Sequence, residues 1–226
     1  WYRTKSTATS IKPDKQIKHG IELSDDFNEA NLGLQWTFWK EYVPKALTFD
    51  NGTLWMKAKG RTPADGRLLL TTAEDKNYET QVEINIGNGN TGGLVLFYNE
   101  NAYAGVVSDG KKFIVYQNAS KQLELPNELG KRFIAKIHNQ GNNLRIMVSK
   151  DSKEWITLAE NVDVSQMHHN NYHGFYALRI GLLSAGKGRA GFKQFRYKNA
   201  VPQEKDMSAY LMVFHKDETH GLYMAV

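Results

Sequence analysis

The residues with the most evident chemical potential lie at 168–173, which read His-His-Asn-Asn-Tyr-His. Imidazole nitrogens bind zinc, and His169 and His173 are four residues apart, a spacing that brings two side chains together on one face of a helix. No helical periodicity surrounds these histidines. The sequence therefore favours a polar loop over a zinc site at this position.

A pair of carboxylates lies on one predicted strand. Glycoside hydrolysis needs two carboxyl groups about 5–5.5 Å apart for retention, or about 6.5–9.5 Å apart for inversion. Glu79 and Glu83 share a strand face, but it is the polar face of an alternating strand, which favours solvated charges over catalysis. No complete catalytic set is visible in the sequence, and whether this chain is an enzyme stays open.

Tryptophans offer a second kind of chemistry, because a flat ring face suits a pyranose. Trp36, Trp39 and Trp55 could line a sugar-stacking platform, or they could belong to the core. The alternation of Leu34, Trp36 and Phe38 predicts a half-buried strand with large apolar anchors. Trp39 breaks that alternation and is the best candidate for an exposed stacking ring.

Many short strands must position these residues. Alternating or apolar segments separated by turn signals predict strands at 47–49, 53–59, 67–71, 78–86, 94–98, 103–107, 112–117, 133–137, 144–149, 174–183 and 191–197. Asp50-Asn51-Gly52 predicts a hairpin turn, whereas 87–93 reads as a flexible glycine-rich loop. The absence of helical periodicity favours an all-β sandwich of two antiparallel sheets, of the jelly-roll type.

Composition limits the classes of partner. The 226 residues include no cysteine, so packing alone stabilises the fold. The net charge of +5 lies partly in the first twenty residues. That run lacks the interleaved aromatic residues of a nucleic-acid surface, and no apolar run approaches the ~20 residues that cross a bilayer. We expect neither a nucleic-acid nor a membrane partner.

The chain divides into three parts. Residues 1–23 read as a linker from an upstream module, and residues 24–199 as the sandwich. Residues 200–226 read as a linker followed by a hairpin, with strands at 209–214 and 221–226. Since the chain begins with Trp1 and ends within an apolar run, both ends look cut from a longer protein.

Five segments together resemble a known family. They are Ser24-Asp25-Asp26-Phe27, Leu32-Gly33-Leu34-Gln35-Trp36, Asn77-Tyr78-Glu79, the run 93–98 and the run 191–197. Their order and spacing resemble the concanavalin A-like β-sandwich that follows the catalytic propeller in many family-43 glycoside hydrolases, which are β-xylosidases, α-L-arabinofuranosidases and arabinanases. The C-terminal hairpin resembles the start of another such propeller.

The resemblance implies site residues. In xylosidases of this family a matching Gly-Phe segment sends an aromatic ring into the catalytic pocket, which here is Phe175, with His169 and His173 at the same interface. Arg179 departs from the aromatic residue expected four positions later. The alternative is that Phe175 belongs to the core. Such sandwiches often hold calcium through carboxylates, and Asp25, Asp26 and Asp163 are the candidate ligands, although their spacing defines no ligand set.

The function implied is that of a non-catalytic accessory sandwich. It would pack on the propeller of the same parent chain and shape the mouth of a site for xylose- or arabinose-containing oligo- or polysaccharides. The alternative is a carbohydrate-binding module that grips polysaccharide on an open sheet face. Beyond calcium no cofactor is expected. The family implies a bacterial periplasmic or secreted protein.

Overall fold

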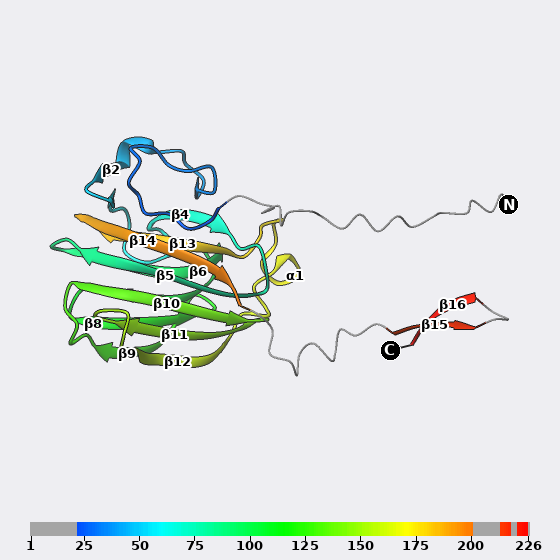
Figure 1. Ribbon diagram of the computed structural model, residues 1–226. Coiled ribbons are helices and arrows are strands. Elements are labelled where there is room, and N and C mark those ends of the chain that lie inside the picture. The colour runs from blue at the N-terminus through cyan, green and yellow to red at the C-terminus, as the bar shows by residue number, and fades with distance from the viewer. Residues whose placement is uncertain (1–21, 201–212, 218–220, 226) are drawn as a thin grey trace.

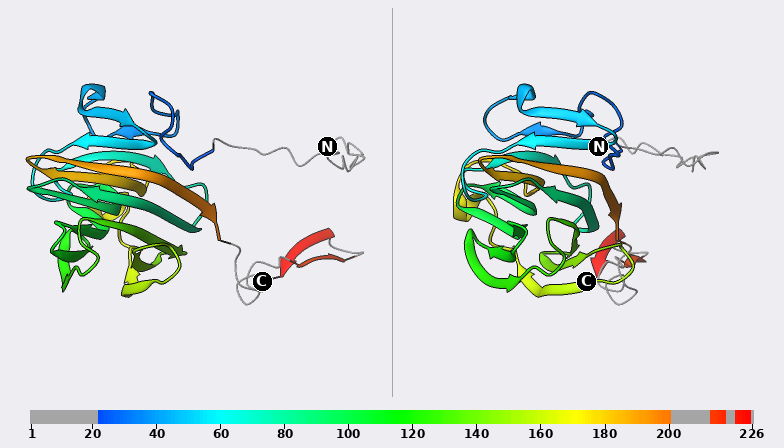
Figure 2. Two further views of the ribbon diagram at one scale, coloured as in Figure 1. Left: turned by 60° about the vertical axis from the view of Figure 1, so that its left-hand side comes forward. Right: turned by 90° about the vertical axis from the view of Figure 1, so that its left-hand side faces the viewer.

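The computed structural model describes residues 22–200, 213–217 and 221–225. Over 22–200, two seven-stranded antiparallel sheets pack face to face (Figure 1). Sheet 1 has the order β1-β4-β13-β6-β7-β8-β9, and sheet 2 the order β12-β11-β10-β5-β14-β3-β2. Figure 2 shows the same two layers from two further directions. The predicted all-β jelly-roll sandwich is confirmed.

The strands of sheet 1 are β1 (Thr37–Phe38), β4 (Arg67–Thr72), β6 (Asn90–Asn99), β7 (Ala102–Ser108), β8 (Lys112–Gln117), β9 (Ser120–Pro126) and β13 (Arg179–Gly186). Those of sheet 2 are β2 (Leu47–Asp50), β3 (Thr53–Lys57), β5 (Asn77–Ile86), β10 (Arg132–Gln140), β11 (Asn143–Ser149), β12 (Ile156–Asp163) and β14 (Arg189–Asn199). Two short helices accompany them, η1 (Pro44–Ala46) and α1 (His169–Tyr172). No helix in the described ranges has the length and apolar character needed to span a membrane.

The core lies between the sheets and follows the period of two. Along β5 the even positions from Tyr78 to Ile86 are buried and the odd positions are half-buried, as the sequence predicts. Apolar side chains from the inner faces of both sheets form one cluster. Three buried rings join the N-terminal segment to this cluster: Phe27, Trp36 and Phe195.

Two hairpins show how turn chemistry sets the register. Asn51 and Gly52 have φ values of 49° and 68° in the two-residue turn between β2 and β3, confirming the predicted turn. Asn118 and Ala119 form an equivalent turn, with φ values of 49° and 60°, between β8 and β9. Because an alanine replaces the usual glycine there, Asn118-Ala119 carries no hairpin signal and β9 is absent from the predicted strands.

Several predicted boundaries are wrong. The strand predicted around Trp36 is only β1, because a turn bond from the Trp36 N–H to the Gly33 carbonyl (3.2 Å) precedes it, and Leu34 is 89% exposed. The loop predicted at 87–93 ends early, since residues 90–93 belong to β6. The strand predicted from Gly174 begins only at Arg179.

The C-terminal hairpin pairs β15 (Val213–Asp217) with β16 (Gly221–Ala225). The strand predicted at 209–214 therefore continues to Asp217. Residues 209–212 lie outside the described ranges, as does most of the predicted linker at 1–23.

Candidate functional site

The loop between β12 and β13, residues 164–178, carries the predicted pocket residues. It contains α1, which begins where the His168 Nδ1 accepts a hydrogen bond from the Asn170 N–H (3.3 Å). After α1 the chain reverses through His173 and Gly174, both in the left-handed region with φ values of 55° and 72°. Phe175 is the next residue after this reversal and is exposed.

Two side chains at the end of β6 hold the reversal in place. The Tyr98 hydroxyl lies 3.0 Å from the His173 carbonyl oxygen and 2.6 Å from that of Gly174, and donates to this pair. The Asn99 Nδ2 donates to the Tyr172 carbonyl (3.0 Å). A loop whose carbonyl groups are bonded to a buried strand is fixed in position, so Phe175 projects from a defined backbone.

Phe175 is 95% exposed, and its ring stacks on His169 with the centroids 5.4 Å apart and the planes at 25°. The alternative that Phe175 belongs to the core is therefore wrong. The expectation that no helix forms here is also wrong, since α1 brings the His173 N–H within 2.9 Å of the His169 carbonyl. Within the described ranges, however, no three His, Asp or Glu side chains gather as a metal would require.

At the end of this loop, two aromatic rings pack around the guanidinium group of Arg179. Tyr176 packs edge-on against Trp39 with centroids 5.2 Å apart, and the Arg179 guanidinium lies 5.1 Å from the Trp39 ring and 6.0 Å from the Tyr176 ring. Burial lowers the pKa of Arg179. Its Nε and Nη2 are buried without a hydrogen-bond acceptor among the residues that the structure describes.

Trp39 is not the freely exposed ring that the broken alternation predicts. It is half-buried, packs edge-on against Phe97 with centroids 5.1 Å apart, and donates from Nε1 to Glu100 (3.0 Å). Glu100 also pairs with Lys40. Burial raises the Glu100 pKa, but the hydrogen bonds and the Lys40 charge outweigh it and leave the pKa below its usual value. Trp39 therefore supports the loop through its contact with Tyr176.

The three candidate calcium ligands do not form one set. Asp25 bridges to Phe195 on β14, whereas Asp163 ends β12, four positions away in the order of sheet 2. Asp26 pairs with Arg196. Calcium binding stays a prediction, now without Asp163 beside the other two carboxylates.

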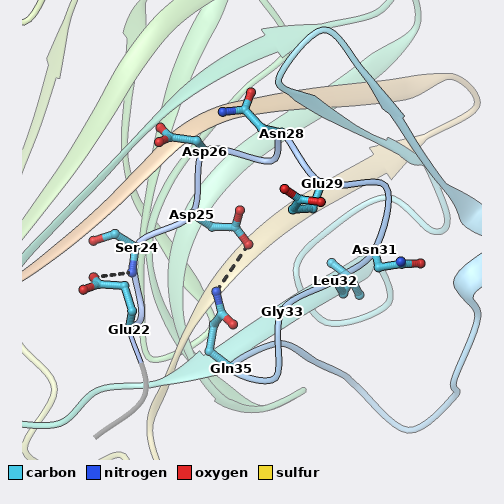
Figure 3. Close-up of a pocket in the computed structure, with 10 residues that line it drawn as sticks. All are labelled: Glu22, Ser24, Asp25, Asp26, Asn28, Glu29, Asn31, Leu32, Gly33 and Gln35. Carbon is cyan, nitrogen blue, oxygen red and sulfur yellow. Dashed lines mark hydrogen bonds between the residues drawn. The ribbon is translucent and has the colours of Figure 1, made fainter. Parts of the chain in front are cut away.

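Asp25 has a different set of contacts. Its Oδ1 accepts from the Phe27 N–H (2.7 Å), and its Oδ2 accepts from Trp36 Nε1 (2.8 Å) and Gln35 Nε2 (3.3 Å). Figure 3 shows the Gln35 contact at the rim of an acidic hollow of about 510 Å³ that also includes Glu22 and Glu29. The Asp25 carboxylate thus holds the segment from Asp25 to Trp36 against the core.

Glu79 and Glu83 lie on the outer face of sheet 2 and are paired with bases. Glu79 lies 3.2 Å from both Lys136 and Lys198, and Glu83 lies 2.8 Å from Arg132. Burial raises the Glu79 pKa, but the two lysines outweigh it and the net pKa is lowered. A general acid of a glycosidase needs a raised pKa, so this geometry does not suit catalysis.

The outer face of sheet 1 is not an open platform. Its side chains form a second buried cluster, made of Leu68, Leu70, Val95, Phe97, Tyr103, Val107, Ile114, Tyr116, Leu183 and Ala185. Trp39, Ala64 and Ala119 pack against this cluster. These side chains are buried, and the alternative of polysaccharide binding on an open sheet face stays a prediction.

Sequence reasoning missed Tyr98, Asn99 and Tyr176 as site residues. The first two bond to carbonyl groups more than 70 residues away in the chain, and no local pattern reports such contacts. Tyr176 could have been identified from the sequence, because it directly follows the predicted site residue Phe175.

Comparison with known families identifies the domain. The family described as the β-xylosidase C-terminal concanavalin A-like domain matches residues 24–198. The chain belongs to this family. As a concanavalin A-like domain of this kind, it is the accessory C-terminal part of family-43 glycoside hydrolases. No curated protein sequence matches the chain significantly.

Solved structures share the fold of this concanavalin A-like domain. The family-43 protein BlXynB from Bacillus licheniformis aligns with a TM-score of 0.70 and 19% identity, over 82% of this chain and 41% of that one. A xylan β-1,4-xylosidase from Bacillus halodurans C-125 gives 0.66 and 17%, over 83% and 41%. Carbohydrate-binding module 66 from Bacillus subtilis gives 0.50 and 17%, over 73% and 96%. The chain thus spans about two fifths of the two hydrolases.

Proposed function

We propose that this domain is the non-catalytic sandwich of a glycoside hydrolase that acts on xylose- or arabinose-containing plant polysaccharides. It packs on the catalytic propeller of the same parent chain and narrows the mouth of the active site. The observation that carries this proposal is Phe175, an almost fully exposed ring on a loop that Tyr98 and Asn99 hold in place.

Exposed aromatic surface is costly, and burying one phenylalanine ring is worth about 1.5–3 kcal/mol. A ring fixed in this position therefore fits a function in which another surface covers it. A bound sugar ring or a pocket wall would provide that cover, and an apolar rim would exclude water from the reacting bond.

The position of the domain ends supports the same arrangement. Ser24 bonds to the Tyr197 backbone near the end of β14, and the Ala200 N–H donates to the Asn77 carbonyl at the start of β5. The α1 loop lies at this same end of the sandwich (Figure 1). A module joined through either end of the domain would start at the same end of the sandwich as the α1 loop.

The test uses the complete parent protein and short neutral xylo-oligosaccharides. Phe175→Ala should lower kcat/KM by roughly tenfold or more, because about 1.5 kcal/mol or more of apolar contact is lost at the active-site mouth. Ile156→Ala is the matched control, since Ile156 is also an exposed apolar side chain but lies on β12. Equal kinetics for the two variants would refute the proposal.

A further inference from the structure

A second hollow lies at the opposite end of the sandwich from the α1 loop. It is bounded by the β5–β6 and β13–β14 turns and by the end of β3, and has a volume of about 470 Å³. The lining residues are Lys45, Ala46, Thr48, Trp55, Lys57, Gly87, Asn88, Gly188 and Arg189. Three of these are basic and none is acidic.

Trp55 and Arg189 form the centre of this hollow. Gly191 faces Trp55 across the β3–β14 pair, and a Cβ at Gly191 would lie 2.9 Å from the indole Cζ3. The ring therefore lies close against the strand backbone, which only a glycine permits. The Arg189 guanidinium lies over the ring, 4.3 Å from its centroid. Stacking of this kind fixes a guanidinium plane while leaving its N–H groups available.

In the described part of the chain, the basic side chains of the hollow are not paired with internal acceptors or carboxylates. Over the described ranges, no side chain accepts a hydrogen bond from the Arg189 guanidinium, and neither Lys45 nor Lys57 forms an ion pair. Asn88 is bonded through its Oδ1 to Lys131, which adds a fourth cation at the rim. Four cations around a hollow without a lining carboxylate create a positive potential that attracts anions.

We propose that this hollow binds an acidic saccharide through a uronate carboxylate. The planar guanidinium of Arg189 matches a carboxylate in a two-bond geometry, and Lys57 and Lys45 add charge from the side. The Trp55 ring edge and Thr48 offer apolar and hydroxyl contacts to the sugar. The choice of a saccharide as the carrier of the anion rests on the family of the domain, and not on the proposed packing of Phe175.

The site is separate from the predicted propeller interface. β14 runs from Arg189 in the hollow to Asn199 beside the α1 end, and its 11 residues span roughly 35 Å. A catalytic module at the α1 end would therefore leave the hollow free to hold an acidic branch of a polymer.

The experiment titrates the 226-residue chain with a matched pair of xylo-oligosaccharides, one bearing a single glucuronic acid substituent and the other neutral. Binding is followed by calorimetry and by the Trp55 indole N–H signal in NMR spectra. We expect saturable binding of the acidic sugar only, weakening as salt rises because exposed charges are screened. Arg189→Gln should weaken binding about tenfold or more, the loss of one charge-assisted contact.

Lys121→Gln, an exposed lysine on β9, is the matched control and should bind as the unmodified chain does. Unchanged thermal unfolding of Arg189→Gln separates loss of binding from loss of fold. Equal affinity for the two sugars, no binding of either, or full retention in Arg189→Gln would overturn the inference. So would tighter binding of inorganic sulfate or single-stranded DNA at the same signal. None of these outcomes bears on the kinetic effect of Phe175→Ala.

Discussion

The Asp25 carboxylate gives the sharpest test of how the N-terminal segment is held. Asp25→Ala leaves two donors without an acceptor, the Phe27 N–H and the Trp36 Nε1–H, both on residues that are buried. Each orphaned buried donor costs about 1–3 kcal/mol, so the free energy of unfolding should fall by about 2–6 kcal/mol. With a urea slope of about 2–3 kcal/mol/M, the midpoint should move down by roughly 1–3 M.

Asp25→Asn should cost about half as much. Its Oδ1 can still accept from the Phe27 N–H, but its amide nitrogen would face the Trp36 Nε1–H, donor against donor. Urea unfolding of the 226-residue chain, followed by circular dichroism, measures both variants. Asp26→Ala is the control, because Asp26 pairs with Arg196 at the surface, where such pairs are worth about 0–1 kcal/mol.

Two results would refute this reasoning. One is a midpoint for Asp25→Ala that equals that of Asp26→Ala. The other is a loss of stability of the unmodified chain in EDTA that Asp25→Ala no longer shows, which would mean that the carboxylate serves a bound calcium ion rather than the two donors.

Three further changes test separate parts of the structure. Ala119→Gly should raise the unfolding free energy by about 0.5–1 kcal/mol in urea, because Ala119 has a φ of 60°; Ala30→Gly should not raise it. Burial, with a smaller effect from Tyr116, raises the pKa of Tyr103 from 10.0 to about 12, so the folded state retains a proton that the unfolded state releases. The stability from this group is full below pH 10 and should fall as the pH rises from 10 toward 12, and Tyr103→Phe should flatten that fall in urea midpoints; an equally steep fall would count against it. Arg179→Phe should raise the melting temperature, because it removes two buried donors without acceptors; a lower melting temperature would show that the cation is needed there.

Periodicity predicted the inner faces of the sheets well. Along β5 and β3 the alternation of Tyr78 to Ile86 and of Leu54 and Met56 identified the buried side chains, because one face of each strand meets the other sheet. The same reasoning failed at Trp39. It assumes that the face opposite the core is solvated, whereas the outer face of sheet 1 holds a second apolar cluster that Trp39 covers.

The candidate site was predictable only in part. The family pattern predicts a pocket role for Phe175, which stays a prediction, and the structure shows its ring exposed. The strand predicted from Gly174 was wrong because the Tyr98 hydroxyl binds the His173 and Gly174 carbonyl groups and keeps them out of the sheet. A contact between side chain and backbone across such a separation leaves no periodic trace in the sequence.

The basic hollow that contains Trp55 and Arg189 shows a different limit of sequence reasoning. Trp55 was one of three tryptophans that could stack on a sugar, and nothing in its neighbours separated it from the others. The structure distinguishes it through Gly191 and Arg189, which lie on a strand more than 130 residues later. Because Gly191 has no side chain, the Trp55 ring lies against the strand backbone, and the Arg189 guanidinium then covers that ring. The stacked pair depends on the pairing of β3 with β14, so neither strand alone reveals it.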